Sequence, residues 1–291
     1  MTIREVLDAY VADLTLRGAR PGSQQNARRI AARLSAVLGE QDAERITPSV
    51  INQYAGLRLA EGIQASTINH HLKILRAALR RAHEDGLIDR LPRVRGVRAN
   101  APVPTYLTAE QLDRLERAAW EISRDAGLAV AIARYAGLRH QEILHLQWRD
   151  ITAEAVTVCA KPEVDWTPKT HAERRIPTAP ALWAAVKPHR RGRSPDAWVF
   201  PGHRGKPKAT LTPEIADSFR YARLHDRKLR PGLHLLRRSW ATLLAGAGVD
   251  IATLRELGGW SSLAVVERYV RSTPARKIDA ILRAFGGADE A

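Results

Sequence analysis

The residues that could do chemistry are concentrated in the second half of the chain. The segment AGLRHQEILHLQWRDI (136–151) places Arg139 just after a glycine turn, with Glu142 one helical turn later, where its carboxylate can orient the guanidinium. The segment PKTHAERRIPT (168–178) places Lys169 at the turn between two expected strands. Cationic side chains of this kind can hold phosphate oxygens, so both segments suit phosphate chemistry.

A third segment, 233–270, adds a further cation and a nucleophile. It contains His234 and Arg237 three residues apart, followed by Trp260 and Tyr269. A tyrosine hydroxyl can form a covalent intermediate when neighbouring groups activate it. The three segments together could therefore transfer a phosphoryl group by means of protein side chains alone.

Other routes to phosphate chemistry are disfavoured by the sequence. The nearest approach to a nucleotide-binding loop, GHRGK (202–206), has two residues between its glycines where a Walker A loop needs four. We find neither paired cysteines nor a zincin helix, and the adjacent His70 and His71 point to different sides of their helix. We therefore expect neither ATP hydrolysis nor a metal-dependent nuclease, and no metal site.

Taken in chain order, these residues resemble the catalytic set of the tyrosine recombinases of the phage integrase family. That set combines an Arg, a Lys at a sheet turn, a His-x-x-Arg pair, a His or Trp, and a Tyr nucleophile. Six positions match in order, and Tyr269 lies nine positions after Trp260. The match spans the whole expected catalytic domain, and the N-terminal part resembles the family's helical core-binding domain.

The resemblance implies a role for each matching residue. Arg139 and Arg237 would clamp the non-bridging oxygens of the scissile phosphate, while Tyr269 attacks phosphorus to give a 3′-phosphotyrosine and release a 5′-hydroxyl. Because a phenol has an ordinary pKa of about 10, the nucleophile needs a base, and His234 is the nearest candidate. The phosphotyrosine conserves the bond energy, so religation needs no cofactor.

The remaining positions follow the family less uniformly. Lys169 would protonate the leaving 5′-oxygen, with Lys161 as a weaker candidate. Trp260 stands where many members have His, and its N–H can donate to a phosphate oxygen but cannot shuttle a proton. Arg238 replaces the usual His after the second Arg, and Leu235 replaces the usual Asp; both leave the catalytic pair intact.

The N-terminal part, 1–91, is predicted to be a helical domain that clamps DNA. Capping signals begin helices at Thr2, at Thr47 with Pro48, and at Ser66, and Gly86 closes the last of these. That last helix has an apolar face formed by Ile68, Leu72, Leu75 and Leu79. Its polar side carries four candidates for DNA contact: Lys73, Arg76, Arg80 and Arg81. From the helix alone, an ordinary solvated face is the better explanation of these four residues.

A connector and a second domain follow. Residues 92–104 contain proline, three arginines and no acidic residue, and we place the domain boundary there. In the catalytic domain, 105–291, Thr108 with Gln111 caps a helix, and 155–177 reads as a small antiparallel sheet. The fold class is thus mainly α with a small antiparallel sheet (α+β). Further helices are expected at 179–187, 213–224, 234–246, 250–258, 262–270 and 274–285.

Composition supports a DNA-binding protein. The 291 residues include 46 Lys and Arg against 31 Asp and Glu, a formal net charge of +15 at pH 7, and most of the basic residues are Arg. The guanidinium fork matches phosphate oxygens, so this balance indicates nucleic acid. The single cysteine, Cys159, excludes an internal disulfide, and no apolar run is long enough to span a membrane. We expect a cytoplasmic, DNA-associated protein.

Two other functions and several partners remain open at this point. A type IB topoisomerase-like enzyme would share the phosphotyrosine chemistry, and 240–262 has the rhythm of a helix-turn-helix, as in a non-catalytic DNA-binding regulator. The family resemblance instead implies a homo-tetramer on double-stranded DNA with inverted-repeat core sites, with helix 274–285 docking on a neighbouring protomer. Because the chain begins directly in the core-binding-like domain, we expect it to lack the N-terminal arm-binding domain of the larger phage integrases. Accessory bending or directionality proteins are possible partners that the sequence does not reveal.

Overall fold

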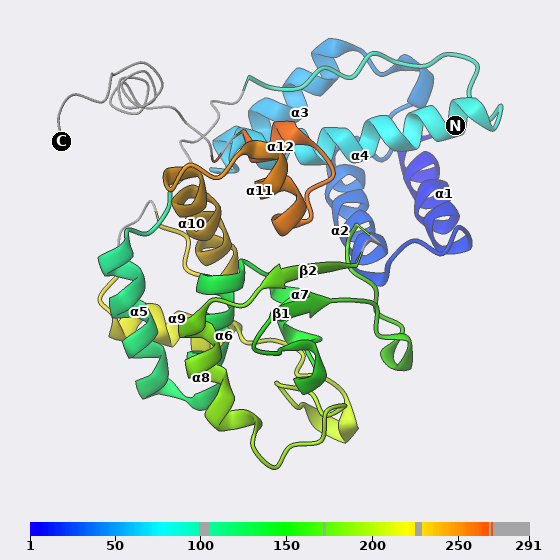
Figure 1. Cartoon of the computed structure of the whole chain (residues 1–291). Helices are drawn as coiled ribbons and strands as arrows, with labels where there is room; N and C mark the ends of the chain where they lie inside the picture. The colour runs from blue at the N-terminus through cyan, green and yellow to red at the C-terminus, as the bar shows by residue number, and fades with distance from the viewer. Residues whose placement is uncertain (99–104, 171–172, 225–228, 268, 270–291) are drawn as a thin grey trace. The chain divides into compact units, whose positions relative to one another are not determined.

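The chain forms two compact units, Met1–Pro102 and Val103–Ala291 (Figure 1). The computed structural model describes every residue except 99–104, 171–172, 225–228, 268 and 270–291. The described residues are mostly helical, with one two-stranded antiparallel sheet, which confirms the predicted fold class. The predicted helix at 274–285 lies outside the described residues.

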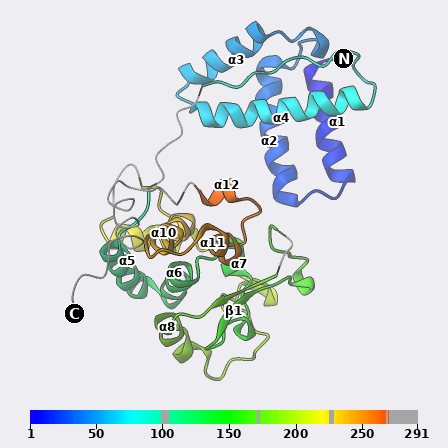
Figure 2. The same cartoon turned by 45° about the horizontal axis from the view of Figure 1, so that its top comes forward.

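The first unit is built from four α-helices: α1 (Ile3–Leu16), α2 (Pro21–Leu38), α3 (Pro48–Ala60) and α4 (Ala65–Glu84). Thr2 and Glu5 form the predicted capping box, and Thr47 caps α3 ahead of Pro48. Helices α1 and α2 lie side by side and α4 crosses both (Figure 2). The predicted apolar face of α4 is fully buried in this core.

One boundary differs from the prediction. Helix α4 begins at Ala65, one residue before Ser66. The residue that precedes the first helical turn is Gln64, which is extended and whose side chain does not cap the helix. The helix ends at Glu84, and Gly86 follows with a φ of +69°.

An extended segment lies along α4 and belongs to the same unit. Asn69 holds it by two hydrogen bonds, donating to the Val97 carbonyl at 2.8 Å and accepting from the Val97 amide at 2.7 Å. Pro92 and Val94 are buried, whereas Arg93 and Arg95 are exposed. This part of the expected connector therefore packs against the first unit and presents its arginines outward.

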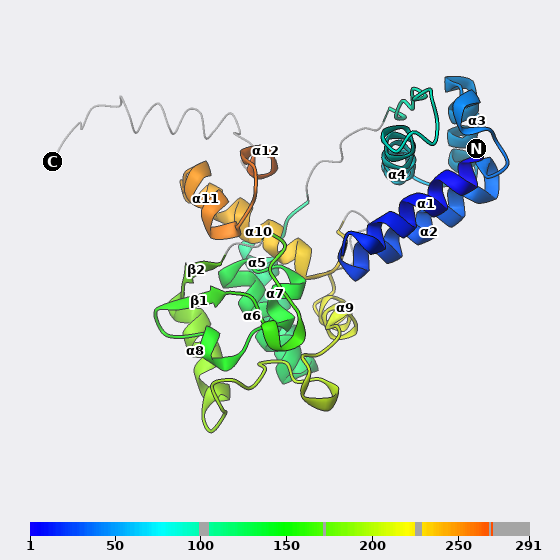
Figure 3. The same ribbon diagram turned by 90° about the vertical axis from the view of Figure 1, so that its right-hand side faces the viewer.

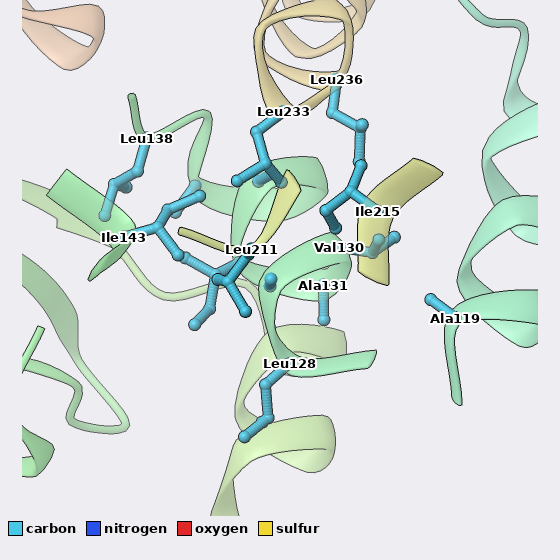
Figure 4. Packing of buried hydrophobic residues seen from close by; sticks show 14 of the residues in the cluster. Ala119, Leu128, Val130, Ala131, Leu138, Ile143, Leu211, Ile215, Leu233 and Leu236 are labelled. Carbon is cyan, nitrogen blue, oxygen red and sulfur yellow. The ribbon is translucent and has the colours of Figure 1, made fainter. Parts of the chain in front are cut away.

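The second unit packs four helices around a buried central helix. The central helix is α6 (Arg124–Ala136), which is apolar almost all round and is contacted by α5 (Ala109–Ile122), α8 (Pro180–Arg190), α9 (Thr212–Tyr221) and α10 (Leu233–Gly246). Figure 4 shows Val130 and Ala131 of α6 packed among Ile215, Leu233 and Leu236. The predicted capping box of Thr108 and Gln111 begins α5.

The small sheet consists of β1 (Ala155–Val158) and β2 (Arg174–Pro177). The strands are antiparallel, with Val156 opposite Ile176. Because side chains alternate along a strand, Arg174 and Ile176 face inward while Arg175 and Pro177 face solvent. A loop that carries Lys169 connects the two strands.

Three shorter helices complete the second unit. Helix α7 (His140–Leu144) follows α6, and α11 (Ile251–Gly258) and α12 (Leu263–Val266) follow α10. Helix α11 packs on α10 and contacts β2 (Figure 3). Helix α12 ends at Val266, whereas the sequence predicted a helix to 270, so Tyr269 lies in a turn. None of the helices in the described parts of either unit is long and apolar enough to cross a membrane.

Candidate active site

The first arginine of the site is placed by two local capping structures. Helix α6 ends at Ala136 and is capped by Gly137. The φ of Gly137 is +62°, which suits glycine, and a Cβ there would clash with the indole ring of Trp240. Arg139 then caps α7, and its backbone N–H donates to Glu142 Oε2 at 2.8 Å. The expected orientation of Arg139 by Glu142 is present, because Arg139 Nη1 donates to Glu142 Oε1 at 2.8 Å.

Glu142 is the buried anion of the site. Besides Arg139, it accepts two hydrogen bonds from Arg174 of β2, from Nη1 at 3.0 Å and from Nη2 at 2.6 Å. Burial alone would raise the pKa of Glu142, but hydrogen bonds and positive charge from Arg174, together with hydrogen bonds from Arg139, lower it from 4.5 to about 2. The carboxylate is therefore ionised and shared between two guanidinium groups.

Arg237 is the most buried cation of the site, with 2% of its surface exposed. It lies one turn after His234 on α10 and donates to the carbonyls of Gly137, at 2.7 Å, and Gly258. Burial, and next the positive charge of Arg139, lower its pKa from 12.5 to about 9. The neighbouring arginines thus add to the effect of burial, and Glu142 offsets only part of it.

Two aromatic rings connect Arg237 to the candidate nucleophile. The guanidinium lies 4.4 Å from the centroid of the Trp260 ring, and the Tyr269 ring is 5.6 Å from Trp260 on the same chain segment. Gly258 leaves room for Trp260, since a Cβ there would clash with the indole. Tyr269 is half-buried, and its charge interaction with Arg237 shows that the two side chains lie near each other.

His234 lies in the first turn of α10 and is exposed. Its pKa is lowered, first because the surrounding protein removes part of its hydration and then because of the positive charges of Arg238, Arg237 and Arg139. A neutral imidazole is the form that can accept a proton. Arg238, one residue after Arg237, donates to the Thr105 carbonyl at 3.3 Å.

The two candidate lysines have opposite environments. Lys169 is exposed in the turn before β2. Lys161 is 1% exposed, and its ammonium lies 2.8 Å from Asp150 Oδ2 and 3.2 Å from the sulfur of Cys159. Lys161 is thus engaged in a buried ion pair, whereas the side chain of Lys169 is exposed to solvent.

Sequence reasoning missed Arg174. Its alternation with Ile176 in RRIPT could have indicated that an arginine faces inward, but nothing local identifies Glu142 as its partner. The site thus combines three guanidinium groups, one carboxylate, an imidazole, an indole and a phenol. Among the described residues, no group of three or more His, Cys, Asp and Glu side chains is arranged to hold a metal ion.

The four candidate DNA contacts on α4 are not equivalent. Lys73, Arg76 and Arg80 are exposed. Arg81 instead forms ion pairs with Asp85 at 2.8 Å and Asp13 at 3.4 Å within the first unit.

The predicted helix-turn-helix rhythm corresponds to α10 and α11, which do pack together. The carbonyls of Leu257, Gly258 and Gly259 at the end of α11 accept hydrogen bonds from the site arginines. This helix pair is therefore part of the candidate active site.

Comparison with known proteins identifies relatives of the whole chain. Residues 105–276 match the model of the phage integrase family. The tyrosine recombinase XerA of Pyrococcus furiosus is 28% identical over 96% of this chain and 94% of its own length, and the integrase of Salmonella phage P22 is 26% identical over 72% of this chain and 57% of its own. The Tn1549 transposon integrase, solved with a circular intermediate DNA, has a TM-score of 0.79 at 20% identity and covers 97% of this chain and 99% of that one.

Proposed function

Because the chain belongs to the phage integrase family, whose tyrosine recombinases cleave and rejoin DNA strands, we propose that its second unit does so through Arg139, Arg237 and Tyr269. Arg139 lies just after α6, Arg237 lies on α10 with His234, and Tyr269 follows α12. Glu142 of α7 and Trp260, just after α11, lie beside them.

The observation that carries the proposal is the excess positive charge of a largely buried site. Three guanidinium groups, those of Arg139, Arg174 and Arg237, face a single carboxylate, that of Glu142, which leaves a formal charge of +2. Burial, and next the positive charge of Arg139, lower the pKa of Arg237 to about 9, and Glu142 offsets only part of this effect. A phosphodiester would supply one negative charge and its pentacoordinate transition state a second, so the site is complementary to the charge that develops during transfer.

The chemistry then follows from the side chains around that charge. Tyr269 loses its phenolic proton to the neutral imidazole of His234 as its oxygen bonds to phosphorus, and the bond from phosphorus to the 5′-oxygen breaks. Lys169, exposed on its loop, gives a proton to the departing 5′-oxygen. Attack of a 5′-hydroxyl on the phosphotyrosine reverses these transfers and rejoins the strand.

The first unit supplies a basic surface for the duplex. Its members are exposed side chains on α4 and on the extended segment that Asn69 holds against that helix: Lys73, Arg76, Arg80, Arg93 and Arg95. Arg81 is excluded because Asp13 and Asp85 already neutralise it. Contacts of this kind bind phosphates without reading sequence.

We extend the proposal to a tetramer on two inverted-repeat DNA sites. Support comes from the lambda integrase, which has been solved as a tetramer bound to a Holliday junction and has a TM-score of 0.74 at 21% identity, covering 94% of this chain and 80% of that one.

A covalent trap tests the proposal. The purified protein is mixed with sheared DNA from its source organism and denatured in detergent, and protein-linked fragments are captured and sequenced beside the Tyr269→Phe variant. We expect adducts at one or a few inverted-repeat sites and none from the variant, which should still bind DNA. Adducts from Tyr269→Phe would refute the assignment of the nucleophile, and adducts scattered everywhere, with relaxation of supercoils, would indicate a topoisomerase instead.

A further inference from the structure

Arg174 forms hydrogen bonds with two other elements of the site through all three of its guanidinium nitrogens. It lies on the inward face of β2 with 8% of its surface exposed, and both of its terminal nitrogens donate to Glu142. Its Nε donates to the Leu257 carbonyl at 3.0 Å. The single side chain thus joins β2, the beginning of α7 and the end of α11, which are far apart in sequence.

The three arginines of the site donate hydrogen bonds to backbone carbonyls at the C-terminal end of α11. Three consecutive carbonyls each accept a hydrogen bond from a different guanidinium: Leu257 from Arg174, Gly258 from Arg237, and Gly259 from Arg139. The last carbonyls of a helix lack partners within the helix and form the negative end of its dipole, so they attract cations.

The turn at Gly259 is shaped by the same contact. Its φ is +58°, and a Cβ at this position would lie 3.1 Å from the guanidinium of Arg174. A residue with a side chain at this position would therefore push the Arg174 side chain away by a few tenths of an ångström, in addition to adopting a strained φ. Trp260 is the next residue, and so the position of this turn also sets where the indole lies between Arg237 and Tyr269.

Glu142 explains why Arg174 matters to Arg139. The buried carboxylate has two oxygens, of which Oε1 accepts from both arginines. Without Arg174, an unshared anion would face Arg139 alone and would compete with a substrate phosphate for the same guanidinium. Its second oxygen would also lose its side-chain partner, at a site where Glu142 is 2% exposed.

We propose that Arg174 is a positioning residue for the DNA-cleaving reaction, which acts through Glu142 and the Leu257 carbonyl to hold Arg139 and the turn before Trp260 in place for the phosphate. The inference rests on the proposed function. Lysine would replace it only in part, because an ammonium is a compact charge that does not present the planar fork with which Arg174 spans two carboxylate oxygens and a carbonyl.

The test compares Arg174→Gln and Arg174→Lys with Arg175→Gln, a matched control that removes the same charge from the exposed face of the same strand. Rates of covalent adduct formation on saturating sheared genomic DNA should fall about 100-fold in Arg174→Gln, as expected for misplaced reacting groups, with DNA affinity unchanged. Arg174→Lys should fold normally and have a cleavage rate between those of the unsubstituted protein and Arg174→Gln. Arg175→Gln should cleave at the rate of the unsubstituted protein.

A double variant separates positioning from direct contact with DNA. If Arg174 acts mainly through Glu142, then Glu142→Gln combined with Arg174→Gln should cleave faster than the product of the two single losses predicts, because only the loss that passes through the Leu257 carbonyl is added. Additive losses would mean that Arg174 acts independently of Glu142 and would overturn the inference. Equal losses in Arg174→Gln and Arg175→Gln would also overturn it, because they would show an effect of total charge.

Inorganic orthovanadate is a second probe, which needs no DNA target. We expect the unsubstituted protein to bind it and Arg174→Gln to bind it at least about tenfold more weakly by calorimetric titration, with Arg175→Gln unaffected. Unchanged cleavage and vanadate binding in Arg174→Gln would overturn this inference alone. A wild-type protein that neither forms adducts nor binds vanadate would overturn the proposed function and this inference with it.

Discussion

Replacing Glu142 by glutamine should remove a large part of the stability of the second unit at neutral pH. The substitution keeps the shape of the side chain but removes the one negative charge that Arg139 and Arg174 share. The pKa of Glu142 falls from 4.5 to about 2 on folding, which at about 1.4 kcal/mol per pKa unit corresponds to about 3 kcal/mol of stabilisation. Removal of one partner from a buried ion pair costs a similar amount, about 3–5 kcal/mol.

The pH dependence of the loss is part of the prediction. Because the folded-state pKa is lowered, the stabilisation is fully present above about pH 5 and disappears as the pH falls toward 2, where the carboxyl is protonated in both states. The difference between the unsubstituted protein and Glu142→Gln should therefore be largest near pH 7 and should shrink below pH 5. A general effect on packing would not change with pH in this way.

Urea unfolding followed by tryptophan fluorescence can measure this loss in the second unit alone, since all seven tryptophans lie between residues 120 and 260. Glu121→Gln is the matched control, because it removes the same charge from an exposed position on α5. A difference below about 0.5 kcal/mol at pH 7, the usual range of a surface substitution, would refute the reasoning, as would a difference that does not vary with pH.

Three further predictions concern catalysis and DNA binding. Trp260→Ala should slow adduct formation about tenfold in a quenched time course, whereas Trp260→Phe, which keeps a ring over Arg237, should retain most of the rate. A normal rate for Trp260→Ala would show that stacking of the indole on Arg237 does not contribute to cleavage. Lys169→Gln should slow cleavage about 100-fold, and a substrate with sulfur in place of the 5′-oxygen should restore the rate, because a thiolate leaves without a proton. If this substrate does not restore the rate, Lys169 is not the acid. Arg80→Gln should weaken binding equally on all DNA sequences and lower the slope of log affinity against log salt by about 1, measured by fluorescence anisotropy, and a sequence-dependent loss would contradict a phosphate contact.

Local sequence signals were sufficient to predict most of the helices. The capping boxes of Thr2 with Glu5 and of Thr108 with Gln111 begin α1 and α5 as predicted, because each involves residues only three positions apart. Periodicity likewise identified the buried face of α4. Where the prediction was wrong, as in the helix expected to reach 270, the local pattern continued beyond Val266 but the helix did not.

The burial and ion pairing of individual charged residues could not be predicted from the sequence. Lys73 and Arg81 belong to the same basic helix, but Asp13 of α1 lies beside only one of them. Similarly, Lys161 and Lys169 both flank the sheet, and the burial of Lys161 against Asp150 separates them. Such differences depend on neighbours from other elements, which a linear pattern does not specify.

The sequence by itself determined the helical character of both units, the order of the candidate catalytic residues and the family to which they point, because periodicity, capping and motif order act over short stretches of chain. Only the tertiary structure decided how those residues are held. Arg174 meets Glu142 across 32 residues and Leu257 across 83, and Arg139 meets Gly259 across 120. These hydrogen bonds form because packing around α6 brings the ends of α7, β2 and α11 together, and no local propensity encodes that encounter.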